Sequence, residues 1–229
     1  MQKAITGRIT LNLIAGILIT VVTVVVAIFW MAARQNDQAS HSTETMVEGG
    51  VEAMKRRVRG YANDYGWWQD FYDAYVARDD EWMQTNIASS VEETEIAEIM
   101  AVVSRDGAIE YGFTVEEDVD ASDILSPEIV AGIEALTADM PVENFAARSA
   151  IIEYNDSVMM LAAAWITPVY ELEANDLSEL PLFVVGITMT EERLRDLGQS
   201  FLIDDLRYVP ADDDAADDGY QIPVNDIFG

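Results

Sequence analysis

The chain has 229 residues, of which 13 are basic and 42 acidic, so its formal net charge is −29 at pH 7. This charge excludes a nucleic-acid binder, because such a protein needs basic surface to neutralise phosphates. The absence of cysteine excludes a disulfide scaffold, a thiolate zinc site and a cysteine nucleophile, and the single histidine excludes a multi-histidine metal site. Half of the residues are hydrophobic, which argues against a disordered acidic tail.

The first element is an uncharged run of 25 residues from Ile9 to Ala33, bounded by Arg8 and Arg34. This run is longer than the about 20 residues that an α-helix needs to cross a bilayer. A cleaved signal peptide would carry a shorter apolar region of about 7–15 residues, followed by a small-residue cleavage site. We therefore predict that residues 9–33 form a retained transmembrane helix in contact with lipid.

Charges flank this segment asymmetrically. Lys3 and Arg8 precede it, whereas acidic residues dominate the chain after it, so the positive-inside rule predicts a short cytoplasmic tail, residues 1–8, and an extracytoplasmic part, residues 34–229. Residues 35–229 carry 10 basic and 42 acidic residues, a net charge of −32. We interpret this charge as a solvated exterior surface and predict a location in the cytoplasmic membrane of a bacterium or archaeon.

A heptad pattern comes after the apolar segment. Its a and d positions hold apolar or aromatic residues with a strict 4-3 spacing: Val47, Val51, Met54, Val58, Tyr61, Tyr65, Trp68 and Tyr72. Such a seam predicts a long packed helix, locally weakened at Gly49-Gly50. Two interpretations remain open and are compatible: the helix lies on its own domain, or it pairs with a second copy near the membrane to form a homodimer.

Residues 61–86 are rich in aromatic side chains with interleaved acids. Aromatic walls with a few polar groups are typical of ligand pockets, and aromatic faces beside carboxylates suit a cation or amine. The candidate ligand-binding residues for an unidentified small molecule or ion are Trp67, Trp68, Asp70, Tyr72, Trp82, Asn86 and Asp64. The alternative interpretation is that these rings form a helix-to-sheet core.

The remaining chain alternates strand and helix signals. The expected strands cover residues 98–104, 108–113, 150–154, 158–170, 182–189, 206–209 and 220–224, and the expected helices begin at Ser126 and Thr190. Gly198 is expected to end the second of these helices. A long helix followed by a mainly antiparallel sheet with flanking helices is an α+β fold.

No motif for catalysis or for a bound metal was found. The sequence contains no phosphate-binding glycine loop, no nucleophile elbow and no zinc-protease motif, so we expect no enzyme activity in this chain and no cofactor. The acidic run from Asp212 to Gly219 fails as a calcium-binding EF-hand loop, because Ala216 and Asn225 occupy two ligand positions. A solvated loop is predicted there.

The run from Tyr61 to Tyr72 (Tyr-Ala-Asn-Asp-Tyr-Gly-Trp-Trp-Gln-Asp-Phe-Tyr) resembles the opening motif of the fourth class of CHASE sensor domains. Trp82 to Ile87 resembles that family's next helix, and Ser104 to Gly107 resembles its first hairpin turn. A late segment of the family is echoed by Val184 to Gly186. The resemblance covers roughly residues 35–229.

This resemblance implies an extracytoplasmic sensor with a PAS/Cache-like sheet, usually attached to a diguanylate cyclase, a phosphodiesterase or a histidine kinase. It assigns no ligand, because the ligands of the family are mostly unknown. Since the sequence stops at Gly229 within an expected strand and turn, we expect it to be the N-terminal part of a longer receptor. The alternative function is a membrane-tethered binding or structural protein without signalling output.

Overall fold

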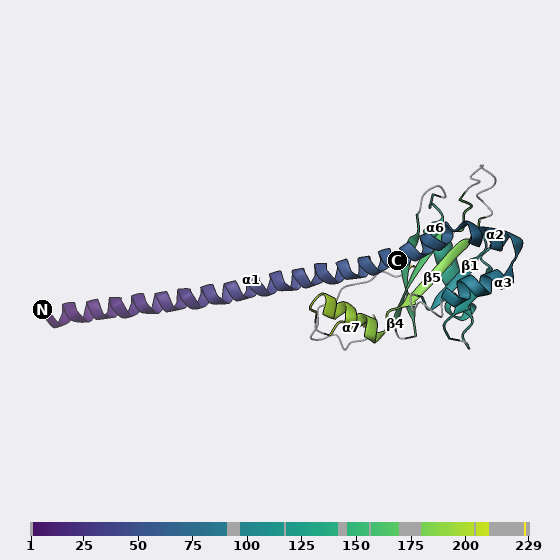
Figure 1. Cartoon of the computed structure of the whole chain (residues 1–229). Helices are drawn as coiled ribbons and strands as arrows, with labels where there is room; N and C mark the ends of the chain where they lie inside the picture. Colours follow the sequence, from purple (N-terminus) through teal and green to yellow (C-terminus); the bar gives the residue numbers. More distant parts are fainter. Residues whose placement is uncertain are drawn as a thin grey trace. The chain divides into compact units, whose positions relative to one another are not determined.

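The structure is a computed structural model that describes residues 2–90, 97–116, 118–141, 146–155, 157–169, 180–203, 205–210 and 227, with side chains from residue 16 except at position 37. The helices are α1 (Gln2–Gly66), α2 (Gln69–Ala77), α3 (Asp80–Met83), the π-helical turn η1 (Gln84–Ala88), α5 (Ala121–Ile124), α6 (Pro127–Thr137) and α7 (Glu191–Ser200) (Figure 1). The strands are β1 (Ile99–Val103), β2 (Ile109–Thr114), β3 (Arg148–Tyr154), β4 (Ser157–Trp165) and β5 (Leu182–Thr188). The chain divides into two compact units, residues 1–46 and 47–229.

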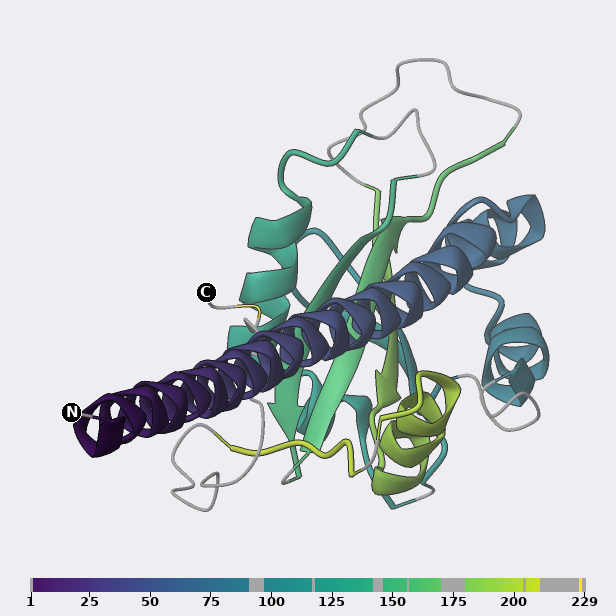
Figure 2. The ribbon, with the colours of Figure 1, turned by 90° about the vertical axis from the view of Figure 1, so that its left-hand side faces the viewer.

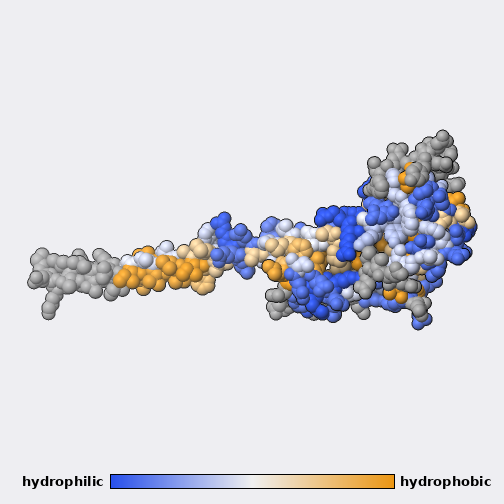
Figure 3. Space-filling view, viewed as in Figure 1, coloured by the Kyte–Doolittle hydropathy of each residue, from blue (hydrophilic) through white to orange (hydrophobic). Residues whose placement is uncertain are grey.

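The first unit consists of the N-terminal part of α1, which is long and apolar enough to cross a membrane. Its large apolar side chains from Ile17 to Met31 are exposed, and Figure 3 shows them as a continuous apolar stretch. The hydroxyl groups of Thr20 and Thr23 donate hydrogen bonds to the backbone carbonyls four residues earlier, at 2.9 and 2.8 Å. Such local bonding satisfies hydroxyl groups where water is absent, which suits a helix in lipid.

The second unit is built on a five-stranded sheet with the order β2-β1-β5-β4-β3, in which every neighbouring pair is antiparallel. Consecutive residues of β1 and β4 belong alternately to two separate hydrophobic clusters, because successive side chains in a strand point to opposite faces. Both faces of the sheet are therefore covered, which explains why all five residues of β1 are buried. An α+β fold with a mainly antiparallel sheet was predicted and is observed.

One face of the sheet packs against the end of α1 and against α2, α3 and α7. Val58 and Ala62 of α1 and Phe71 of α2 are buried in this layer. The described heptad positions from Val51 to Tyr72 all pack into the same cluster, so the interpretation that the seam lies on its own domain is confirmed for them. Pairing with a second copy stays a prediction.

The opposite face is covered by α5 and α6, which Figure 2 shows across the sheet from α7. Helix α6 begins as predicted, because the Ser126 hydroxyl accepts a hydrogen bond from the Ile129 N–H and Pro127 occupies the first turn. Helix α5 begins with a capping box formed by Asp120 and Asp123. Ile124 and Val130 are buried against the sheet.

Helix α7 is joined to the sheet and to α1. Arg193 forms an ion pair with Glu98, whose carboxylate also accepts from the backbone N–H of Thr188, so the start of α7 is fixed beside β5. A Cβ atom at Gly50 of α1 would lie 2.9 Å from Cε2 of Phe201 and 3.1 Å from Cδ1 of Leu197. The glycine that was expected to weaken the long helix is therefore the position at which α7 comes close to α1.

Several boundaries differ from the sequence-based expectations. The long helix ends at Gly66, so Tyr72 lies in α2, and β4 stops at Trp165 rather than near residue 170. Helix α7 continues past Gly198 to Ser200. Residues 206–209 form no strand, because none of the described strands pairs with them and a β-rich run alone gains no ladder hydrogen bonds. The expected strand 220–224 and the acidic loop lie outside the described residues.

The two adjacent glycines of α1 provide a matched test of the contact with α7. Gly50→Leu should lower the free energy of unfolding by about 1–3 kcal/mol, because the new side chain overlaps Phe201 and Leu197. Gly49→Leu should raise the free energy of unfolding by roughly 0.5–1 kcal/mol. A Cβ atom at Gly49 would meet no neighbouring heavy atom within 4 Å apart from the backbone of its own helix, and leucine is a better helix former than glycine. Urea unfolding of the full chain in detergent, followed by Trp fluorescence, measures both; equal effects would contradict the contact.

Candidate functional site

Two aromatic residues of the predicted site, Trp68 and Trp82, belong to a continuous stack of rings between helices and sheet. The ring centroids of Trp68 and Trp82 are 5.0 Å apart, and those of Phe71 and Trp82 are 6.2 Å apart. Tyr65 stacks on Phe183 of β5 at 5.3 Å, and Phe71 meets the same ring edge-on at 5.4 Å. Offset and edge-on pairs at these distances stabilise a core beyond the area that they bury.

The seven candidate residues lie between the end of α1 and the turn η1. Trp67 lies in the turn after α1, and Trp68 is the residue before α2; both are half-buried, as are Tyr72 of α2 and Trp82 of α3. Asn86 is half-buried in η1 and donates a hydrogen bond to the carbonyl of Trp82 at 2.9 Å. Asp64 and Asp70 are exposed. None of the seven lines either of the two cavities described below, and ligand binding by them stays a prediction.

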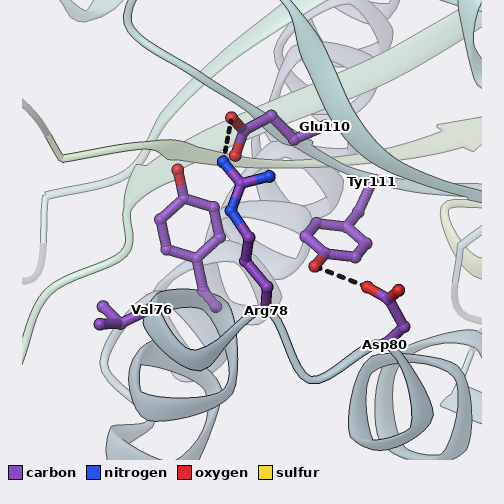
Figure 4. Close-up of a pocket in the computed structure, with 6 residues that line it drawn as sticks. Val76, Arg78, Asp80, Glu110 and Tyr111 are labelled. Atoms are coloured by element: carbon purple, nitrogen blue, oxygen red, sulfur yellow. Dashed lines mark hydrogen bonds and ion pairs between the residues drawn. The ribbon is translucent and has the colours of Figure 1, made fainter.

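A cavity of about 370 Å³ is lined by residues from the α2–α3 region and from β2 (Figure 4). We call it the Arg78 pocket, and its lining residues are Tyr75, Val76, Arg78, Asp80, Glu110 and Tyr111. The first four residues come from the end of α2 and the start of α3, and the last two come from β2. The pocket therefore joins the segment after the aromatic motif to an edge strand of the sheet.

Arg78 enters the pocket from a strained backbone position. It caps the C-terminus of α2 with φ 53° and ψ 47°, in the left-handed region that glycine normally occupies at this point of a helix. A side chain in this region costs of order 1–3 kcal/mol, and such outliers cluster at functional sites. Of the described non-glycine residues with positive φ, which are Arg78, Asn155, Leu202 and Asp205, only Arg78 lines one of the two cavities.

Glu110 and Tyr111 reach the same pocket because β2 contains a bulge. Val102 of β1 pairs with Tyr111 and Val103 pairs with Ile109, so Glu110 is the extra residue. Ile109 packs on one face of the sheet and Tyr111 on the other, although a regular strand would place both on the same face. Bulges redirect side chains in this way and are frequent next to functional sites.

The charged and phenolic groups of the pocket are arranged in two pairs. Nη2 of Arg78 lies 3.9 Å from Oε1 of Glu110, and the Tyr111 hydroxyl donates a hydrogen bond to Asp80 at 2.9 Å (Figure 4). Burial and the neighbouring Glu110 carboxylate raise the pKa of Tyr75 to about 12. Burial and the hydrogen bond to Asp80 also raise the pKa of Tyr111. Both phenols therefore stay protonated at neutral pH and donate hydrogen bonds.

A second cavity of about 240 Å³ is lined by residues that include Arg105, Glu134, Trp165 and Leu182. The guanidinium carbon of Arg105 lies 4.2 Å from the ring centroid of Trp165. The face of this indole is therefore already in contact with a cation. Of the two cavities, the Arg78 pocket is the larger and has two phenols and two carboxylates, so we take it as the candidate site.

Sequence reasoning missed Arg78, Glu110 and Tyr111, although it placed Tyr75 and Asp80 in the aromatic and acidic region. A left-handed backbone at an arginine has no sequence signal, because glycine or asparagine is the usual residue at this point of a helix. The bulge in β2 has no sequence signal either, because the residue pattern of the strand does not show that Glu110 and Tyr111 reach the same pocket as the end of α2. The one available signal was the short distance between Tyr75, Arg78 and Asp80 along the chain.

Comparison with known proteins supports the resemblance seen in the sequence. The family model of the CHASE4 domain matches residues 51–209. The chain belongs to the CHASE4 family. No curated protein matches the chain. CHASE4 is a family of sensor domains, and every residue that lines the Arg78 pocket lies within the matched segment.

Within the CHASE4 domain, the aromatic motif can be tested as core. Trp68→Ala should lower the free energy of unfolding by about 2–4 kcal/mol, because the ring contacts Tyr65 and Trp82 and is half-buried. Asp70→Ala should lower it by only about 0.3–1 kcal/mol, because this exposed carboxylate interacts mainly with the N-terminus of α2. Urea unfolding followed by circular dichroism distinguishes them. An unchanged free energy of unfolding in Trp68→Ala would contradict the packing role of this ring.

The phenol of Tyr75 gives a prediction for the pH dependence. Its pKa in the folded state is about 12, above the ordinary value of 10, so its contribution to stability is present below pH 10 and is lost as pH rises toward 12. Glu110→Gln should lower this pKa but keep it above 10, since burial remains. Phenolate absorbance, assigned to Tyr75 by a Tyr75→Phe variant, measures the change. Glu128→Gln on the exposed start of α6 is the control and should leave the titration unchanged.

Proposed function

We propose that the chain is the membrane-anchored extracytoplasmic input domain of a signal-transduction receptor. The observation that carries this proposal is the presence, in one chain, of a CHASE4 domain over residues 51–209 and of an N-terminal helix long and apolar enough to cross a membrane. Residues 9–33 would cross the lipid bilayer of a bacterial or archaeal cytoplasmic membrane. Residues 1–8 would lie in the cytoplasm, and residues 34–229 outside.

The domain would work by binding a small molecule or ion in the Arg78 pocket. Arg78 and Asp80 belong to the connection between α2 and α3, and Glu110 and Tyr111 belong to β2, so a ligand that contacts both groups would draw a helix connection toward the sheet. A ligand changes the population of two conformations only if it binds one of them more tightly. The five-stranded antiparallel sheet with helices on both faces also supports the PAS/Cache-like assignment.

The signal would pass through α1, which is continuous from the apolar segment to Gly66. The C-terminal part of this helix packs on the sheet, and α7 contacts it at Gly50. A homodimer formed through the membrane-proximal part of α1 would convert a change in this packing into a change between two helices. The output would be a diguanylate cyclase, a phosphodiesterase or a histidine kinase.

Cysteine labelling tests the proposed membrane topology, because the chain has no cysteine of its own. A membrane-impermeant maleimide should label Glu128→Cys in intact cells, since this position is exposed on α6 and would be extracytoplasmic. It should label Gln2→Cys only after the cells are permeabilised. The cysteine-free chain is the control for background labelling. Labelling of Gln2→Cys in intact cells, with protection of Glu128→Cys, would reject the proposed function.

A further inference from the structure

The Arg78 pocket contains charges of both signs, which restricts the class of ligand. The guanidinium of Arg78 lies beside the Glu110 carboxylate, and the Asp80 carboxylate lies beside the Tyr111 hydroxyl (Figure 4). The pocket also has one apolar wall, Val76, which is 62% exposed. A simple anion would face both carboxylates and a domain surface of strongly negative charge. A simple cation would face Arg78. A ligand with both charges is complementary to the whole set.

Arg78 is prepared to bind a carboxylate. Its contact with Glu110 is 3.9 Å long, beyond hydrogen-bond distance, and its side chain is 82% exposed. A guanidinium has five N–H donors in a planar fork that matches the two oxygens of a carboxylate. Its long and exposed contact with Glu110 leaves this fork available for a bidentate hydrogen bond to a ligand.

Asp80 is prepared to bind an ammonium group. Its carboxylate accepts one hydrogen bond from the Tyr111 hydroxyl, which holds it in place. A carboxylate has about four acceptor positions, which leaves several for the N–H groups of a ligand. The two tyrosine rings also provide aromatic surface of the kind that attracts a cation.

We infer that the Arg78 pocket binds a small zwitterion that carries an ammonium and a carboxylate group, with Arg78 contacting the carboxylate and Asp80 contacting the ammonium. The cavity of about 370 Å³ admits a ligand of the size of a free amino acid or of its N-methylated betaine. The inference rests on the proposed function, because it names the ligand of the same sensor. The inference also explains why an arginine occupies this strained backbone position, since a glycine there would remove the guanidinium that binds the ligand.

The test measures binding by calorimetry, with the full chain in detergent and with each of the common L-amino acids and its N-trimethylated betaine as probes. For the tightest-binding amino acid, three analogues are then measured: the amine without the carboxylate, the acid without the ammonium, and the N-trimethylated betaine. Each single-charge analogue should bind about tenfold more weakly or worse, because a charged group of the site is left without its partner. The betaine distinguishes the two kinds of zwitterion, the free amino acid and the N-methylated betaine. Its nitrogen carries a positive charge but no N–H donor.

Three variants assign the roles. Arg78→Gly should abolish binding and yet raise the melting temperature of the unliganded protein, because glycine relieves the left-handed backbone. Asp80→Asn should weaken binding of the amino acid more than binding of the acid analogue, which has no ammonium group. Arg56→Gln on an exposed part of α1 is the matched control and should bind like the wild type.

The outcomes separate the ligand class from the proposed function. Absence of binding by every amino acid and betaine, equal binding of a single-charge analogue, or wild-type binding by Arg78→Gly would each overturn the zwitterion inference. The cysteine labelling of intact cells would be unaffected by any of these results. If instead the labelling contradicts the proposed topology while the amino acid binds, the sensor function fails and the binding site stands.

Discussion

The structure of the second unit depends on a sheet that is apolar on both faces. Because β1 and β4 alternate between two hydrophobic clusters, neither face is stable in water without a covering layer. The chain supplies α5 and α6 for one face and the end of α1 with α2, α3 and α7 for the other. Elements from the beginning and the end of the domain thus share one layer, and they are held there by the same buried strands.

The position of the site results from this layer. The ring of Trp82 in α3 contacts Phe71 of α2 and Trp68, the residue before α2, and the two helices are joined by only Arg78 and Asp79. A short connection is formed by one residue in a left-handed conformation, and that residue is Arg78. On the other side of the pocket, β2 is an edge strand that pairs with β1 alone among the described strands, so the bulge disturbs one ladder. The pocket therefore lies where two regular elements are interrupted.

Sequence reasoning predicted the elements with strong periodicity or clear caps. The cap at Ser126 and the strand that became β5 are local patterns, and both are observed. The seam from Val51 to Tyr72 packs on the sheet as predicted, although the long helix ends at Gly66. The expected strand at 206–209 is wrong, because β-propensity is realised only beside a partner strand and none of the described strands pairs with this run. Arg78 and Glu110 come together through a strained cap and a bulge, two departures from regular geometry that depend on the packing around them. Residue patterns predict regular helices and strands. They therefore indicated the region of the chain that holds the site, but not the charged groups that line it.

The close contact at Gly50 also restricts how related sequences can vary. The space at this position is filled by Leu197 and by the ring of Phe201, so a side chain on α1 and a large ring just after α7 exclude each other. A relative with a larger residue at the position of Gly50 must carry a smaller one at the position of Phe201, or its α7 must lie elsewhere. The identities at these two positions, taken together, thus report from sequence alone whether α7 rests on α1.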